Sequence, residues 1–285
     1  MKTIKYILVI LVLSVSFVSC SDDENDDDII EVNPVADLNK IYEFPLTDRV
    51  IEIYSAKQGL EVGYNELSIR VKDLAADKYL ENIAISWMPM MHMETMMHSA
   101  PHSDLSNSEE NSVYTGHIVF QMPGNATEFW DVTFDYTFNG ETVSETHQLS
   151  VMQPVDGLKK TQVFMGADDV RYVLAYVSPV NPEVAVNDFE AVLYKMENMM
   201  SFPLVENYTI TVDPRMPGMG NHGSPNNEDL HYNSVTKTYQ GKLSLTMTGY
   251  WRVNLKLMNE NDETLKGEDV TEANPESSLY FELEF

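Results

Sequence analysis

The chain has 285 residues, 43% of them hydrophobic, and carries 18 Lys and Arg against 45 Asp and Glu, a formal net charge of −27. A protein with this much negative charge repels nucleic acid and anionic lipid head groups. We therefore expect neither as a partner. The apolar content excludes general disorder, and the length is typical of two domains of ordinary size.

The first 19 residues have the features of a secretory signal peptide. Lys2 and Lys5 precede an unbroken apolar run over residues 7–13, and smaller residues follow it. The run is too short to span a membrane as a helix. We therefore expect residues 1–19 to be removed on export.

Residues 17–20, Phe-Val-Ser-Cys, resemble a bacterial lipobox, with Phe17 in the place where Leu is usual. This resemblance implies that Cys20, the sole cysteine, becomes the lipidated first residue and anchors the protein to a membrane. Residues 21–28 are mostly acidic and resemble the sorting tract of Bacteroidota lipoproteins, although a solvated acidic linker is the alternative. We expect a linker over residues 20–40 and a location in the cell envelope, at the outer membrane, on its periplasmic or surface-exposed face.

The most distinctive stretch covers residues 88–98, which contain six methionines and two histidines in eleven positions. Thioether sulfur is a good ligand for Cu(I), and imidazole binds both Cu(I) and Cu(II), so the composition favours copper. Pro89, Glu94 and Pro101 interrupt any strand or helix period, which predicts an irregular loop of about 25 residues. The alternative is that the flexible methionines fill a hydrophobic core.

The second half of the chain repeats motifs of the first half in the same order, which indicates two tandem copies joined near residues 153–157. The first copy has Asn65-Glu66-Leu67, Met88-Pro89-Met90-Met91, His98-Ser99-Ala100-Pro101, Tyr114-Thr115-Gly116, Met122-Pro123-Gly124 and Trp130-Asp131-Val132. The second copy has Asn187-Asp188-Phe189, Met216-Pro217-Gly218-Met219, His222-Gly223-Ser224-Pro225, Tyr239-Gln240-Gly241, Met247-Thr248-Gly249 and Trp251-Arg252-Val253. We expect one domain over residues 41–152 and another over residues 153–285.

Each copy has the pattern of a β-rich domain. Apolar residues alternate with polar ones from Trp130 to Phe138, as in a strand with one buried face, and Asn139-Gly140 suits the tight turn of a hairpin. Residues 251–257 alternate in the same way before a polar turn. The sequence thus predicts an all-β protein of two tandem immunoglobulin-like antiparallel β-sandwich domains.

The Met-Pro-x-Met, Tyr-x-Gly and Gly-x-Trp motifs of residues 216–219, 239–241 and 249–251 resemble the YtkA-like domain, an extracytoplasmic β-sandwich related to FixH-type domains that accompany copper handling. The resemblance covers residues 160–258 well and residues 41–138 more loosely. It implies an envelope protein linked with copper and without catalytic activity. The first copy departs from the pattern, since Met90 replaces the glycine and residues are inserted before His98.

Two sets of candidate ligands follow. The matching positions of the two copies are Met88, Met91, His98 and Met122 in the first and Met216, Met219, His222 and Met247 in the second. The remaining candidates, all in the first copy, are Met90, His92, Met93, Met96, Met97 and His102. In the second copy the same residues equally suit a core in which Met216 and Met247 close the end of the sandwich.

Two functions remain open from the sequence. One is a lipid-anchored, non-enzymatic protein that sequesters Cu(I), or relays it to an envelope protein partner, with Cu(II) as the alternative ion. The other is a cell-surface module that binds a protein or glycan through its methionine-rich segment. Motifs of serine hydrolases, zinc hydrolases and phosphate-binding loops are absent from the sequence, so we expect no enzyme.

Overall fold

The computed structural model describes residues 33–108 and 111–285, and Pro34–Phe285 forms one compact unit. The expected signal peptide, the lipidated Cys20 and the acidic tract lie outside the described residues. Within the described ranges no helix is long and apolar enough to cross a membrane.

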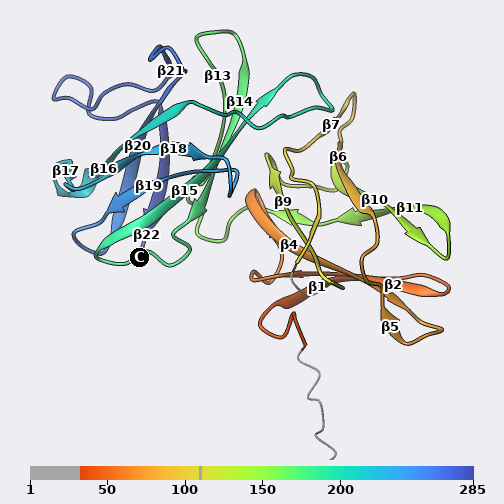
Figure 1. Ribbon diagram of the computed structural model, residues 1–285. Coiled ribbons are helices and arrows are strands. Elements are labelled where there is room, and N and C mark those ends of the chain that lie inside the picture. Colours follow the sequence, from red (N-terminus) through yellow and green to blue (C-terminus); the bar gives the residue numbers. More distant parts are fainter. Residues whose placement is uncertain (1–32, 109–110) are drawn as a thin grey trace, which may run out of the picture. The chain divides into compact units, whose positions relative to one another are not determined.

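The described residues are almost all β-strand and turn, as the alternation of apolar and polar residues predicts, and their only helix is the short 3₁₀ segment η1 (Pro217–Met219). Strand pairing is antiparallel throughout this part of the chain, except between β12 (Val151–Met152) and β3 (Leu60–Glu61). The expected all-β, antiparallel fold is therefore present (Figure 1).

Two sheets form from residues 39–149. One contains, in order, β1 (Asn39–Pro45), β2 (Arg49–Ser55), β4 (Gly63–Asp73), β9 (Tyr114–Phe120) and β8 (Ser106–Asn107), with β5 (Lys78–Tyr79) beside β4. The other contains β11 (Glu141–Leu149), β10 (Phe129–Phe138), β6 (Ile85–His92) and β7 (Met97–Ser99).

Residues 161–284 form one larger, continuous sheet. Its order is β13 (Thr161–Met165), β14 (Arg171–Ser178), β15 (Val186–Met196), β19 (Thr238–Ser244), β18 (Glu228–Asn233), β16 (Thr209–Met216), β20 (Tyr250–Met258) and β21 (Thr264–Lys266). In addition, β17 (His222–Gly223) pairs with β16, and β22 (Leu279–Glu284) pairs with β20.

Each half of the chain has its own hydrophobic core. In the first half, residues of both sheets meet, among them Ile53, Phe120 and Trp130. In the second half, Phe189 and Trp251 belong to a corresponding cluster. Burying each of these side chains contributes on the order of 2 kcal/mol, so each half gains stability from its own core.

The predicted hairpin at Asn139-Gly140 is confirmed. Phe138 pairs with Glu141, and both turn residues have positive φ, 52° and 81°. These backbone angles match the right-handed twist of the flanking strands, and asparagine and glycine are the residues that adopt them at least cost. The turn thereby sets the register of β10 and β11.

Matched strands of the two halves occupy matched positions in the sheets. The order β2-β4-β9 of the first half corresponds to β14-β15-β19 of the second, and β10-β6-β7 corresponds to β20-β16-β17. The indole N–H of Trp130 donates to the carbonyl of Met122 at 2.9 Å, and that of Trp251 donates to the carbonyl of Met247 at 3.0 Å. Two residues that the repeat aligns therefore make the same bond.

A third, smaller apolar cluster joins the two halves. Val119 of β9 packs with Val173, Val192 and Tyr194 of β14 and β15. Beside it, the Nε2 atom of His117 lies 2.6 Å from the hydroxyl oxygen of Tyr194. The contact between the halves thus combines apolar packing with a hydrogen bond.

Candidate functional site

The methionine-rich segment is a β-hairpin, and the expectation of an irregular loop is wrong for most of it. Residues 88–92 continue β6, residues 97–99 form β7, and the amide N–H of Met93 donates to the carbonyl of Met96 at 2.9 Å to close the turn. β6 pairs with β10 on its other side, so tertiary pairing holds Pro89 in a strand position. Strand periodicity therefore sorts the candidate ligands onto two faces.

One face of the hairpin belongs to the core of the first half. Met91 is fully buried, and its cross-strand partner His98 lies edge-on to Trp130, with ring centroids 5.5 Å apart. Met93 and Met122 pack against the same core from its margin. Met91 therefore fills the hydrophobic core, as the alternative to metal binding predicts.

The other face carries Met88, Met90 and His92, all partly buried, with the more exposed Met97 directly opposite His92 on β7. Because Met88 and Met91 point to opposite faces, the four residues that the repeat matches in the first copy do not converge on one point. The face with Met88, Met90, His92 and Met97 is hereafter called the outer Met/His face.

Asp131 of β10 holds His92 in place. Its carboxylate oxygen lies 2.6 Å from His92 Nε2, and the carboxylate is largely buried, with 8% of the residue exposed. His92 also stacks on Phe129 at a centroid distance of 4.7 Å. With Nε2–H donated to Asp131, the lone pair of Nδ1 remains for a metal, the arrangement in which a carboxylate orients a ligating histidine.

Two other histidines are fixed by backbone carbonyls. Nδ1–H of His98 donates to Ser99 O at 2.8 Å, and Nδ1–H of His102 donates to Ala100 O, also at 2.8 Å. Each therefore keeps Nε2 as an acceptor, but His98 lies on the core side of the hairpin. His102 forms a bridge with Ile118, away from the strand pair β6–β7.

His117 has the most strongly perturbed acid–base chemistry near the hairpin. Burial between the halves, together with the proximity of His102, lowers the pKa of His117 to about 4. The neutral ring is held by Tyr194 and lies beside Tyr64, with ring centroids 4.8 Å apart. This histidine serves the contact between the halves rather than the outer Met/His face.

The candidate ligands of the second half are more dispersed. Met216 is buried in the core and Met247 packs against that core, whereas Met219 and His222 are exposed. A side chain at Gly249 would lie 3.1 Å from the methyl carbon of Met216, which shows how closely Met216 is packed. Burial thus assigns Met216 to the core and Met247 to its margin, apart from the exposed Met219 and His222.

In the described part of the chain, no three His, Cys, Asp or Glu side chains are grouped as a metal site. Hard divalent ions such as Ca²⁺ and Mg²⁺ need several oxygen ligands, which the outer Met/His face does not offer. Thioether sulfurs and a single imidazole suit a soft ion. The residues present on this face therefore fit Cu(I).

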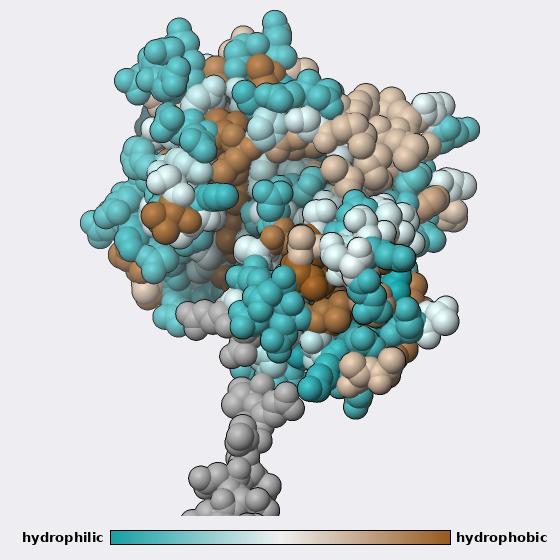
Figure 2. Space-filling model, turned by 45° about the vertical axis from the view of Figure 1, so that its right-hand side comes forward, coloured by the Kyte–Doolittle hydropathy of each residue, from teal (hydrophilic) through white to brown (hydrophobic). Residues whose placement is uncertain are grey.

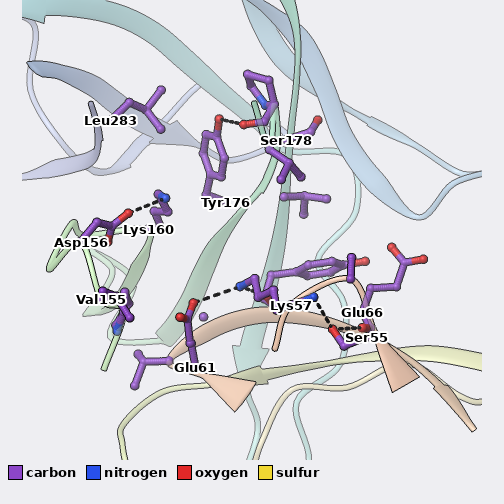
Figure 3. A pocket seen from close by; sticks show the side chains of 18 of the residues that line it. Ser55, Lys57, Glu61, Glu66, Val155, Asp156, Lys160, Tyr176, Ser178 and Leu283 are labelled. Carbon is purple, nitrogen blue, oxygen red and sulfur yellow. Dashed lines mark hydrogen bonds and ion pairs between the residues drawn. The ribbon is translucent and has the colours of Figure 1, made fainter. Parts of the chain in front are cut away.

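A separate cleft of about 710 Å³ lies between strands of the first half and the segments around β14 of the second half. Figure 3 shows two ion pairs on its walls, Lys57 with Glu61 at 3.5 Å and Lys160 with Asp156 at 3.0 Å. Most of the remaining lining is apolar or aromatic, including Tyr176. Four of its charged groups form these two pairs, and Glu66 and Glu284 add carboxylates to the lining, so the cleft is mainly apolar with a slight excess of acidic groups.

Sequence reasoning missed Asp131 as a site residue, although it lies within the strand pattern that was correctly predicted. Its pairing with His92 joins residues 39 positions apart in the chain. The only signal available was an acidic residue between Trp130 and Val132, which predicts an outward-facing carboxylate but not its partner.

Comparisons with known proteins add little to the geometry. No protein-family model matches the chain, and no curated protein matches it. Among solved structures, a DUF4785 family protein from Legionella pneumophila aligns with a TM-score of 0.27 and 11% identity, over 77% of this chain and 55% of that one. This chain thus spans about half of that protein's length, and similarity at this level identifies neither a shared fold nor a shared function.

Proposed function

We propose that the protein is a lipid-anchored, non-catalytic envelope protein that binds Cu(I) on the outer Met/His face. The observation that carries the proposal is the arrangement of Met90, His92 and Met97 on one side of a paired hairpin, with Asp131 fixing the imidazole. Met97 lies opposite His92, a position in which Cβ atoms are about 5 Å apart, and Met90 lies two residues from His92 on the same face, about 7 Å away. The flexible thioethers can therefore turn toward the ring.

The accessible position of these groups suits capture and release rather than permanent storage. Met97 is exposed, and His92 and Met90 are only partly buried. An ion bound there remains open to exchange with a second protein. We therefore propose relay of Cu(I) to an envelope partner, with Cys20 as the lipid anchor that keeps the protein at the membrane.

The test is an anaerobic titration with Cu(I) against a chromophoric competitor, on protein expressed from residue 29 so that Pro34–Phe285 stays intact. We expect tight binding of at least one Cu(I) in the wild type and its loss when Met90, Met97 and His92 are replaced by Leu, Leu and Phe. The matched control replaces the exposed Met152 and Met165 by Leu. Failure of the wild type to compete for Cu(I) at any ratio rejects the proposal, and Zn(II) and Ca(II) serve as comparison ions.

We also propose that the two halves are tandem copies of one immunoglobulin-like sandwich, related to the YtkA-like family. The support is a shared set of hydrogen bonds. The side chain of Asn65 accepts the amide N–H of Glu61 and donates to the carbonyls of Glu61 and Gly63. The side chain of Asn187 makes the same three bonds with Glu183 and Ala185. Two copies of one fold would make the same bonds at matched places. Separate expression of residues 34–152 and 153–285 tests this, because each copy should fold alone.

The cleft of about 710 Å³ favours a second candidate function, a binding module for an apolar ligand or partner segment. Small-molecule ligands usually bind in clefts of this size that are mainly apolar and contain a few polar groups. Binding of an environment-sensitive fluorophore that is weakened by a new charge in the lining, as in Ala56→Asp, would support it. If no fluorophore binds, the proposed ligand-binding function of the cleft is wrong.

A further inference from the structure

A second group of methionines lies against the β6–β7 hairpin and comes from the other half of the chain. Met199 and Met200 belong to the connection between β15 and β16, and the amide N–H of Ser99 donates to the carbonyl of Met199 at 2.8 Å. Figure 1 shows this connection, in teal, reaching the hairpin beside β7. The edge of β7 is therefore covered by residues about one hundred positions later in the sequence.

The turn that carries these methionines is well ordered by its own hydrogen bonds. The side-chain oxygen of Asn198 accepts the amide N–H of Met200 at 2.8 Å, and Asn198 and Ser201 form a bridge. The amide N–H of Glu197 also donates to the carbonyl of Ser201 at 3.1 Å. The backbone thus holds Met199 and Met200 in fixed places rather than in a long, unrestrained loop.

Exposure separates these residues from core methionines. Among the described residues, seven methionines are more than two-fifths exposed, and four of them, Met96, Met97, Met199 and Met200, belong to the hairpin or to this turn. Figure 2 brings the side with β6 and β7 forward, and pale brown, moderately hydrophobic side chains gather on its upper part. Packing alone does not require four such side chains in water at one place.

Strand register brings the two groups within reach of each other. Ser99, which binds Met199, lies opposite Met90, and Met97 lies opposite His92. Met97 and Ser99 are two apart on β7, so they share a face and lie about 7 Å from each other. Met199 lies next to Ser99, so the side chains of Met97 and Met199, both flexible, start from neighbouring positions. The edge of the outer Met/His face thus meets the turn that carries Met199.

We propose that Met199 and Met200 complete the soft-metal site, so that one monovalent ion is held by both halves of the chain. The ligands are Nδ1 of His92, the thioethers of Met90 and Met97, and at least one thioether from the turn. This inference rests on the proposed copper function and goes beyond it, because it assigns residues of the second half to the site. The ligand class is a soft monovalent cation, Cu(I) in function and Ag(I) as a redox-inert probe.

A site shared by both halves also links metal binding to their contact. An ion that binds only the assembled arrangement stabilises it by mass action. The metal should therefore raise the melting temperature of the wild type by more than that of a variant in which only the hairpin ligands remain.

The experiment is a titration of Ag(I) into protein with ¹³C-labelled methionine methyl groups, again expressed from residue 29, followed by NMR. We expect the methyl signals of Met199 or Met200 to shift in the same step as those of Met90 and Met97. The double variant Met199→Leu/Met200→Leu should bind Cu(I) about tenfold more weakly or worse, since even outer-shell partners affect metal affinity on this scale.

The control for this variant is Met152→Leu/Met165→Leu, which removes two exposed thioethers elsewhere. Equal metal-free melting temperatures show that the variants are folded. The shared site is wrong, and the hairpin site stands, if the Met199 and Met200 methyl signals of the wild type do not shift with Ag(I) and the Met199→Leu/Met200→Leu variant binds Cu(I) as tightly as the wild type. If the wild type binds neither ion, the copper function itself is wrong, and the shared site with it.

Discussion

The buried His117 should make the stability of the protein depend on pH. Its pKa is lowered to about 4, chiefly because burial disfavours the charged ring, with a smaller contribution from His102. In the unfolded chain the same ring has a pKa near 6.5. Between about pH 6.5 and 4 the ring is protonated in the unfolded state but neutral in the folded state. The free energy of unfolding is therefore highest above about pH 6.5 and falls as the pH decreases toward 4.

The size of this loss follows from the difference between the two pKa values. A shift from 6.5 to about 4 corresponds to about 3 kcal/mol when complete, of which about 2 kcal/mol is lost by about pH 5. Urea unfolding followed by tryptophan fluorescence, between about pH 7.5 and pH 5, measures it. The His117→Gln variant should lack this part of the pH dependence, whereas the exposed His231→Gln should retain it.

A second variant, His102→Gln, tests the same point if the His117→Gln protein does not fold. His102→Gln removes the neighbouring imidazole, so the pKa of His117 should rise and the pH dependence should become shallower. If wild type and His117→Gln lose the same free energy of unfolding over this range, His117 is not the source of the pH dependence. The same follows if His231→Gln changes the slope as much as His117→Gln.

Three further predictions concern the hairpins. Met91→Ala should reduce the free energy of unfolding by about 2–5 kcal/mol, because it empties a fully buried position, whereas the exposed Met96→Ala should change it by less than about 0.5 kcal/mol. Equal losses in urea unfolding would contradict the assignment of the two faces. Asp131→Asn should weaken Cu(I) binding about tenfold in the competition titration by releasing His92 from its carboxylate. An unchanged affinity would mean that this pair does not orient a ligand. Gly140→Val should cost roughly 1–2 kcal/mol, because φ is 81° there, and a variant as stable as wild type in thermal unfolding would refute that reason.

The features that could be predicted are those with a local cause. The hairpin at Asn139-Gly140 follows from residues that tolerate positive φ, and β10 follows from the alternation between Trp130 and Phe138. In both cases neighbouring residues determine the backbone, so the sequence pattern is sufficient.

The shape of the methionine-rich segment could not be predicted in this way. Methionine has no strong strand signature, and Pro89 argues against a strand, yet pairing of β6 with β10 overrides both. The contacts of Asp131 with His92 and of Ser99 with Met199 join distant parts of the chain. Which thioethers share a face, and which reach the second half, therefore depends on tertiary structure alone.

X-ray absorption at the copper edge tests the central claim most directly, on protein that holds one equivalent of Cu(I). We expect sulfur neighbours together with the scattering pattern of an imidazole ring, and loss of the sulfur contribution when Met90 and Met97 are replaced by Leu. A spectrum with only nitrogen and oxygen neighbours, or a protein that retains no copper, would contradict a thioether and imidazole site on the outer Met/His face.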